Sequence, residues 1–490
     1  MSAAPISFFQ NNINQGGAQV FGIDPNIQVP KVLEYNIGIQ RNIGFKSVLE
    51  VRYVGSRSDD FIRTTTFNQV DLRSNGFLSD FQKAQQNCRL QGATLPGAAN
   101  AFDTLFICTD ARYNPAIPGS QPLTVFNNLA SGGFLNNAAV FPLIQAGRAG
   151  SLAQFYFLNN LSGTVPLVKN PNLFVDEILQ NSGTLRYNAL QVEVRRRFSD
   201  GMSFQVNYTF QKTLSDFPDE DQNRQDELQD NNNPRLNYSR PDFDRTHTLN
   251  ANAIYELPFG KGKRFLNRGG LMNLLFGGFQ LTSIVNQSSV PPIGIIDPRS
   301  TSTITFASGR QSATSTLNDE QIKDLTGIFK TPNGIYFINP KVLFAVATPI
   351  QTPGAPNTLP VINGFDLTQP LPPGYRLTSV RAASPLGQAP FPGQVFFFNQ
   401  AGSTGNLPRN FLNGLPFLNW DAGLSKSIRF TENTRLQLRM EVFNVLNKQV
   451  PFFGTTGAFG GLDVNSNSFG RVTQTYNAPR IVQFGARFDF

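Results

Sequence analysis

Residues 185–211 read LRYNALQVEVRRRFSDGMSFQVNYTFQ and carry the clearest structural signal in the sequence. Apolar residues recur at every second position from Leu190 to Val194, and the same alternation resumes over residues 202–211, after Asp200-Gly201. Successive side chains of a strand point to opposite faces, and Asp-Gly between two alternating runs is a strong hairpin signal. The stretch therefore predicts two antiparallel strands, each with one apolar and one polar face.

Nine segments of the sequence alternate between apolar and polar residues in this way. They are residues 33–40, 49–53, 185–198, 202–211, 246–257, 276–289, 418–428, 436–442 and 482–490. The connections between them are short and long in turn, and the two longest cover about 57–184 and 290–414. We expect these two segments to contain short strands or helices of their own, for example within residues 335–346.

Short turns at one end of a meander and long loops at the other are typical of outer-membrane barrels. The predicted fold class is therefore all-β: an antiparallel transmembrane outer-membrane β-barrel with short periplasmic turns and long extracellular loops. At least nine strands are visible, which is an odd number, whereas single-chain bacterial barrels use even strand numbers. The visible strands therefore suggest part of a larger barrel. A soluble secreted β-sandwich that binds glycans is an alternative, although it has no reason to sort its connections by length.

The composition agrees with a β-rich chain. Only 15% of the 490 residues are charged, and Phe is abundant with 45 residues, which is too aromatic for a disordered chain. The sequence contains no run of about 18 apolar residues, so it predicts no transmembrane helix. The formal net charge is +8, but Lys and Arg are scattered and no nucleic-acid-binding motif accompanies them, so we expect no nucleic-acid partner.

The sequence offers few residues for catalysis or metal binding. His247 is the single histidine, so a histidine cluster for a metal cannot form, and we expect no enzyme, no metal and no cofactor. Cys88 and Cys108 lie in a stretch rich in Gly, Pro and Asn; in an exported protein they predict one loop disulfide, with two free thiols as the alternative. The acidic residues between Asp216 and Asp230 predict a solvated loop, since their spacing does not match an EF-hand calcium loop.

Four segments resemble a known family. Residues 187–201 (YNALQVEVRRRFSDG) resemble a barrel segment of TonB-dependent transporters of the Oar-like type, as do residues 53–57 (YVGSR), 255–265 (YELPFGKGKRF) and 439–447 (RMEVFNVLN). The terminal Phe490 is similar to the aromatic carboxyl terminus by which the barrel-assembly machinery recognises such barrels. The resemblance extends from about residue 30 to 490, without the long loops.

The resemblance implies a barrel of about 22 strands whose lumen is closed by an amino-terminal plug. No signal peptide, TonB-binding segment or plug is recognisable in residues 1–490, so we expect this chain to be the carboxyl-terminal portion of the barrel, with the TonB complex as a partner only through an amino-terminal part. The expected location is the outer membrane, in contact with its lipid. The expected activity is capture and uptake of an unknown extracellular ligand, without covalent chemistry.

The polar face of the clearest strands supplies the candidate ligand contacts, since in this fold that face lines the wet lumen. These lumen-facing candidates are Gln191, Glu193, Arg195, Gln205, Asn207, Thr209, Gln437, Arg439 and Glu441. The second functional hypothesis is a non-transporting surface barrel that only displays adhesive loops.

Overall fold

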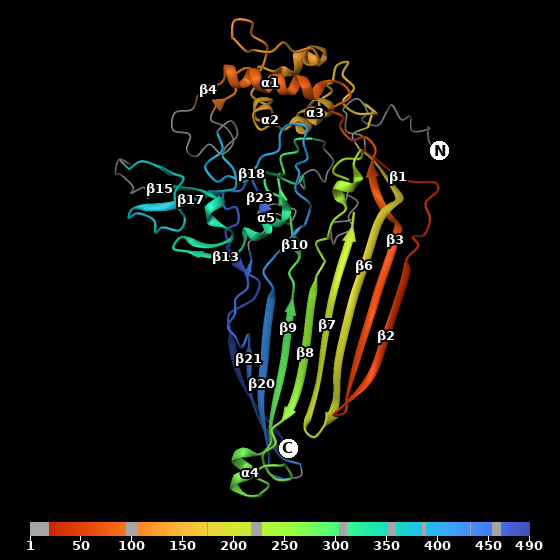
Figure 1. The fold of residues 1–490 in the computed structure, drawn as a ribbon, viewed down its shortest axis with the longest axis vertical. Helices are drawn as coiled ribbons and strands as arrows, with labels where there is room; N and C mark the ends of the chain where they lie inside the picture. The colour runs from red at the N-terminus through yellow and green to blue at the C-terminus, as the bar shows by residue number, and fades with distance from the viewer. Residues whose placement is uncertain are drawn as a thin grey trace, which may run out of the picture.

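The main element of the computed structural model is one large antiparallel sheet (Figure 1). The structure describes residues 19–94, 106–173, 175–216, 228–302, 311–350, 359–384, 389–431, 433–452 and 462–490. The sheet has the order β2 (Leu33–Gly44), β3 (Ser47–Thr66), β6 (Val175–Ser199), β7 (Met202–Ser215), β8 (His247–Glu256), β9 (Phe279–Ser288), β20 (Phe417–Arg429), β21 (Arg435–Phe443) and β25 (Ile481–Asp489). The prediction of an antiparallel meander is confirmed, and each of the nine predicted segments falls on one of these strands.

One further strand joins the sheet. β1 (Gln19–Ile23) pairs in parallel with Val175–Leu179, at the start of β6. Within the described residues β2 and β25 are each paired on one side only, so the sheet is not closed.

The hairpin turns follow from local backbone preferences. Asp200 and Gly201 have φ angles of 54° and 78°, and two consecutive left-handed residues form the tight turn whose twist matches that of the flanking strands. The hairpin turns lie at the end of the sheet near the C-terminus, whereas the long connections gather at the other end (Figure 1). The β8–β9 connection is an exception among the turns because it contains the helix α4 (Leu271–Phe276).

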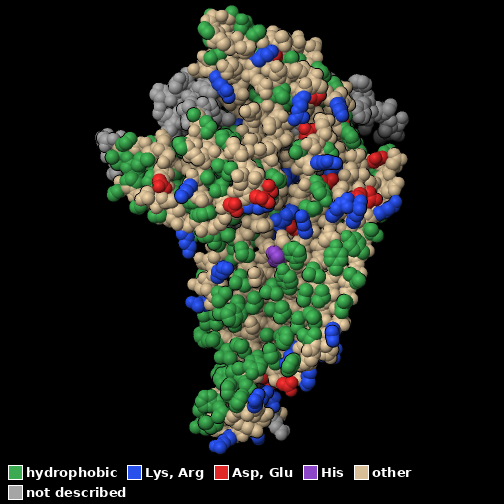
Figure 2. All heavy atoms as spheres, viewed as in Figure 1, with side chains coloured by type: hydrophobic (Ala, Val, Ile, Leu, Met, Phe, Trp, Pro, Cys, Tyr) green, Lys and Arg blue, Asp and Glu red, His purple; other side chains and the backbone are tan. Residues whose placement is uncertain are grey.

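The register gives the sheet one apolar face. Val194, Val206 and Ala251 are neighbours across β6, β7 and β8, and the same face continues to Phe484 on β25, which is 75% exposed. Figure 2 shows hydrophobic side chains covering this lower part of the molecule. The apolar positions of β7 extend from Met202 to Phe210, which is long enough for one crossing, since a tilted strand crosses a membrane with about 9–11 residues. Phe490 is 96% exposed rather than buried in a core.

Aromatic side chains mark the external border of this face. The hydroxyls of Tyr35 and Tyr53 both donate to Asn188 Oδ1, at 3.0 and 2.7 Å. His247 Nδ1 lies 2.8 Å from the Tyr208 hydroxyl. Rings with a polar tip favour the boundary between lipid and water, so His247 belongs to an aromatic girdle on the outer surface.

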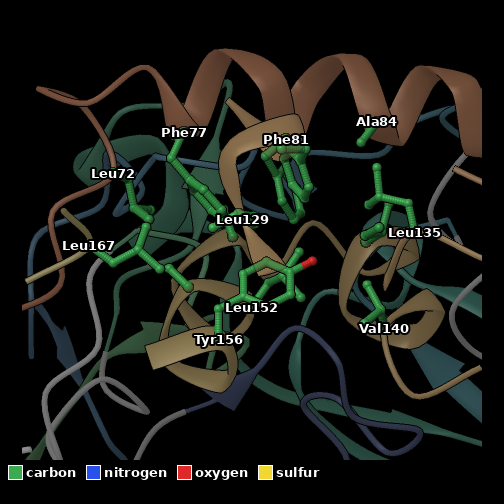
Figure 3. Close-up of a cluster of buried hydrophobic side chains, with 14 of the residues drawn as sticks. Leu72, Phe77, Phe81, Ala84, Leu129, Leu135, Val140, Leu152, Tyr156 and Leu167 are labelled. Carbon is green, nitrogen blue, oxygen red and sulfur yellow. The ribbon is translucent and has the colours of Figure 1, made fainter. Parts of the chain in front are cut away.

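The long connections fold into an external cap, which has two modules. The first cap module comprises the described part of residues 67–173 and contains β4 (Ala93–Thr94), β5 (Phe106–Ile107), α1 (Phe77–Gln91), α2 (Phe141–Gln145) and α3 (Ala149–Leu158). Its core is aromatic: Phe77 packs 5.3 Å from Phe126 and 6.1 Å from Tyr156, measured between ring centroids. Figure 3 shows side chains of α1 and α3 meeting in this core.

The second cap module comprises the described part of residues 289–416 together with parts of 444–480. Its elements are β10 (Pro292–Ile293), β11 (Ile295–Ile296), β12 (Thr314–Ser315), α5 (Asp319–Asp324), β13 (Thr326–Thr331), β14 (Gly334–Ile338), β15 (Phe344–Pro349), β16 (Ile362–Asn363), β17 (Tyr375–Arg381), β18 (Phe396–Phe397), β19 (Leu412–Asn413), β22 (Pro451–Phe452), β23 (Leu462–Asp463) and β24 (Gln474–Thr475). Tyr336, Phe396 and Phe469 lie in its hydrophobic core. Among the described residues, no helix is long and apolar enough to cross a membrane.

A buried ion pair joins the two modules. Arg299 of the second module donates from Nη1 to the Ala146 carbonyl of the first at 2.8 Å, and from Nη2 to the Asn399 carbonyl at 2.9 Å. Its Nε and Nη2 donate to the two carboxylate oxygens of Asp297, at 2.7 and 2.5 Å. Both side chains are almost fully buried, so the loss of one charge would leave the other buried without its partner.

Candidate ligand-contact surfaces

Six of the candidate polar side chains are paired across β6 and β7. Gln191 lies opposite Thr209, Glu193 opposite Asn207, and Arg195 opposite Gln205. Because all six have the opposite parity to Leu190 and Val194, they share the face of the sheet that is turned away from the apolar one.

Within this group the side chains interact. Gln205 Nε2 donates to Glu193 Oε1 at 3.3 Å, and Arg195 Nε lies 3.9 Å from the same oxygen. The group therefore presents a carboxylate, a guanidinium and several amides, which can donate and accept hydrogen bonds at neighbouring positions.

The remaining three candidates lie on β21. Arg439 Nη2 donates to Gln437 Oε1 at 3.0 Å, and Glu441 is opposite Gln483 of β25. β8, β9 and β20 separate this group from β6 and β7, so the nine candidates form two groups rather than one site. Asn250 and Asn286 lie on the polar face between them; these positions were not predicted, because β8 and β9 alternate less clearly.

A cavity of about 760 Å³ lies at the external end of β7 and β8. Its lining includes the cations Lys212, Arg235, Arg240, Lys323 and Arg409, and none of the described residues that line it is acidic. Residues 210–214, 229–246, 312–323 and 404–413 contribute to its wall. Sequence reasoning missed this cavity because only the fold brings these segments together and no local motif marks them.

Arg240 is held rigidly at the wall of this cavity. Its Nε donates to Asp244 at 2.7 Å, its Nη1 to Asn413 Oδ1 at 2.7 Å and its Nη2 to Thr246 Oγ1 at 2.8 Å. The bond to Asn413 links the 228–246 segment to the second cap module. Arg240 therefore shapes the cavity, whereas Lys212 and Arg235 supply charge to its lining.

A second cavity, of about 580 Å³, lies at the other end of the sheet beside α4. Glu256, Gln280, Ser425 and Gln437 contribute polar groups to it. Of the nine candidates from the sequence, Gln437 lines this cavity.

The other residues singled out from the sequence lie elsewhere. Cys88 and Cys108 are joined by a disulfide in the first cap module, with their Cα atoms 5.1 Å apart. Asp216 pairs with Arg63, and Asp230 pairs with Arg73. Most of the acidic segment between those two aspartates (217–227) lies outside the described residues, and among the described ones no cluster of three or more His, Cys, Asp or Glu could hold a metal ion.

Asp463 is a buried carboxyl group in the second cap module. Burial raises its pKa to about 6, and the nearby Asp297 adds to the rise, although the Asn465 N–H, at 2.8 Å, and Arg299 act in the opposite direction. The folded cap therefore holds this proton at a pH where an unfolded aspartate has already lost it. By linkage, the cap loses stability as the pH rises from about 4 to about 6, and keeps the lower stability above that window.

Asp463→Asn is expected to remove this pH dependence and to stabilise the cap by roughly 2 kcal/mol at neutral pH. The measurement is urea unfolding of the cap, with proteolytic cleavage as the readout. It is made at about pH 4.5, 6 and 7.5, so that the series spans the range in which the stability changes. The exposed Glu320→Gln serves as a control and should leave the profile unchanged. If the stability of Asp463→Asn changes with pH as that of the wild type does, Asp463 is not the group responsible for the pH dependence.

The comparison with protein-family models agrees with this architecture. The family model described as an outer membrane beta barrel domain matches residues 2–483. Solved structures similar to this chain include the outer membrane transporter YddB from Escherichia coli (8% identity, TM-score 0.34, covering 97% of this chain and 34% of that one). Another is the ferric enterobactin receptor PfeA from Pseudomonas aeruginosa, as a mutant (9% identity, TM-score 0.31, 97% and 34%).

A third is the ferric-catecholate import receptor Fiu from E. coli K12 (9% identity, TM-score 0.30, covering 95% of this chain and 28% of that one). This chain spans about a third of the length of these structures. No curated protein matches the chain. The family model covers nearly the whole chain, and the chain therefore belongs to the outer membrane β-barrel domain family, whose place is the outer membrane.

Proposed function

We propose that this chain forms the wall and external cap of a TonB-dependent receptor that takes up an extracellular ligand. The observation that carries the proposal is the basic cavity at the external end of β7 and β8. It opens where the cap meets the wall, and its lining includes Gln211, which lies on the face of β7 that carries Gln205, as well as Phe210 and Lys212 on the other face. The four segments that resemble Oar-like transporters support the same function.

The lining of the cavity favours an anionic ligand. Lys212 and Arg235 can each make charge-assisted hydrogen bonds to a carboxylate, sulfate or phosphate, and such bonds are roughly twice as strong as neutral ones. The polar side chains of β6 and β7, and those of β21, would then provide contacts along the lumen. Phe490 would serve as the assembly signal, and the TonB complex would act through the amino-terminal plug that the family resemblance implies.

The experiment compares the compounds that cells remove from their medium. Cells with the intact receptor and cells lacking it are grown in the same medium, and depleted compounds are identified by mass spectrometry. Uptake predicts at least one anionic compound that is depleted only with the receptor, and a protonophore should stop its depletion. A barrel that only displays adhesive loops predicts no such compound, and that outcome would refute the proposal.

The double variant Lys212→Gln/Arg235→Gln is expected to slow depletion at least about tenfold, because each lost hydrogen bond to a charged group costs about 1.5–3 kcal/mol. Lys330→Gln is the matched control, since Lys330 is exposed on β13 and outside the cavity lining. Amounts of each variant in the outer membrane are measured in parallel. If Lys330→Gln slows depletion as much as the double variant does, the cavity is not the binding site.

A further inference from the structure

The β8–β9 turn (residues 257–278) contains a feature that the formation of a barrel wall does not explain. It carries α4, and five of the six residues of that helix are large, apolar and exposed: Leu271, Met272, Leu274, Leu275 and Phe276. Leu271 alone is 69% exposed. A helix that is apolar on most of its circumference requires an apolar environment, and within the described residues none of α4 is buried.

The turn is an ordered unit. Asn273 Oδ1 accepts a hydrogen bond from the Lys261 N–H at 2.8 Å, which fastens the helix to the start of the turn. The Phe265 N–H donates to the Pro258 carbonyl at 2.9 Å, and the rings of Phe259 and Phe265 lie 5.8 Å apart. These contacts fix where the apolar side chains of α4 are presented.

α4 is joined to the apolar face of the wall by Lys426. This residue lies opposite Phe279 in the register and shares the apolar face with Leu424. Its Nζ donates to the Leu275 carbonyl at 2.7 Å and to the Gly277 carbonyl at 3.3 Å, and lies 4.1 Å from the centroid of the Phe279 ring. Figure 2 shows hydrophobic surface continuing from the sheet down to the end of the molecule where Figure 1 places α4.

The two sides of α4 differ. Leu274 lines the second cavity, beside the polar groups of Glu256 and Gln280. Met272 and Phe276 are each two residues away, which is about 200° around a helix of 3.6 residues per turn. They therefore point away from the cavity.

The charges of the turn are all positive. Residues 257–278 contain Lys261, Lys263, Arg264 and Arg268 and no Asp or Glu. Lys263 pairs with Glu256 at 2.5 Å, and the Arg264 guanidinium lies 5.4 Å from the Phe265 ring. Apolar side chains bordered by cations are the pattern of a helix that lies in the headgroup region of a membrane with anionic lipids.

We propose that α4 lies in the headgroup region of the periplasmic leaflet of the outer membrane. Met272 and Phe276 reach the first carbons of the acyl chains, and Lys261, Arg264 and Arg268 contact the phosphates of anionic phospholipids. The helix needs little affinity of its own, because β8 and β9 already hold it at the membrane. This inference rests on the outer-membrane location and is independent of the proposed ligand uptake.

Spin labelling of the intact protein in lipid vesicles tests the proposal. Phe276→Cys and, in a separate protein, Met272→Cys are labelled with a nitroxide; Cys88 and Cys108 are disulfide-bonded and do not react. The collision rates of each label with oxygen, which concentrates in lipid, and with a water-soluble nickel chelate are measured by electron paramagnetic resonance. Ile328→Cys in the external cap is the matched control, since Ile328 and Phe276 are 49% and 48% exposed.

The proposal predicts an oxygen-to-nickel collision ratio several-fold higher at positions 276 and 272 than at 328. A low ratio at 276 would place α4 in water, and low collision rates with both reagents would place it against protein; either result overturns the proposal. The headgroup contact is tested with Lys261→Gln/Arg264→Gln/Arg268→Gln in vesicles with and without phosphatidylglycerol. The ratio at 276 should fall in the triple variant only when phosphatidylglycerol is present, and an unchanged ratio would overturn the role of the cations.

Discussion

Arg299→Met is expected to destabilise the external cap by about 3–5 kcal/mol, the usual cost of leaving a buried charge without its partner. In the wild type the guanidinium neutralises Asp297, whose side chain is fully buried. It also lies 4.4 Å from the Phe398 ring and donates to the carbonyls of Ala146 and Asn399. Methionine can replace the contact with Phe398, but it can replace none of the hydrogen bonds.

The loss is measured by proteolysis of the cap across a urea series. Asp297→Asn/Arg299→Met should recover much of the loss, because the isolated charge is then absent. Arg112→Met is the control: Arg112 is exposed and pairs with Asp110 at the surface, so its loss should cost less than about 1 kcal/mol. An Arg299→Met cap within about 1 kcal/mol of the wild type would show that the pair does not hold the modules together.

Val206→Arg is expected to destabilise the wall by about 2–4 kcal/mol, as a cation near the middle of the lipid-facing surface of a barrel does. Val206 is central among the apolar positions of β7, between Val194 of β6 and Ala251 of β8. Asn207→Arg introduces the same side chain one position further along. Because Asn207 is on the other face and opposite Glu193, this variant should cost little.

The pair of variants is compared by urea unfolding of the intact protein in lipid vesicles, with heat-modifiable gel migration as the readout of folded barrel. Equal losses in the two variants would contradict the assignment of the apolar face to lipid. A greater loss in Asn207→Arg would reverse the two faces.

The fold was predictable because most of it depends on local patterns. The Asp200-Gly201 turn and the alternation around Val206 fix a strand pair and its faces without information from elsewhere in the chain. The ends of β3 and β6 were less predictable: the predicted long loop 57–184 includes residues of both strands. The register shifts between Ser58 and Phe61 and between Phe61 and Ile62, and such an irregularity interrupts the alternation from which a strand is recognised.

The candidate site was less predictable than the fold. Parity along β6 and β7 is enough to place Glu193 and Gln205 on one face, but it cannot show that three strands lie between β7 and β21. The basic cavity depends on Lys212 and Arg409 meeting across the fold, and the buried Arg299–Asp297 pair lies inside a segment without recognisable periodicity. Such long-range contacts leave no local pattern in a single sequence. The Oar-like subfamily stays a prediction from the four resembling segments.

The length of β6 has a consequence for the position of the cap. The strand has 25 residues, whereas about 9–11 cross a membrane. Residues 175–187 precede Asn188 of the aromatic girdle and extend roughly 40 Å along the strand at about 3.3 Å per residue. Together with the outer part of β3 they continue the wall past the girdle, so the first cap module, which follows β3 at Phe67, departs from the sheet well beyond the lipid boundary.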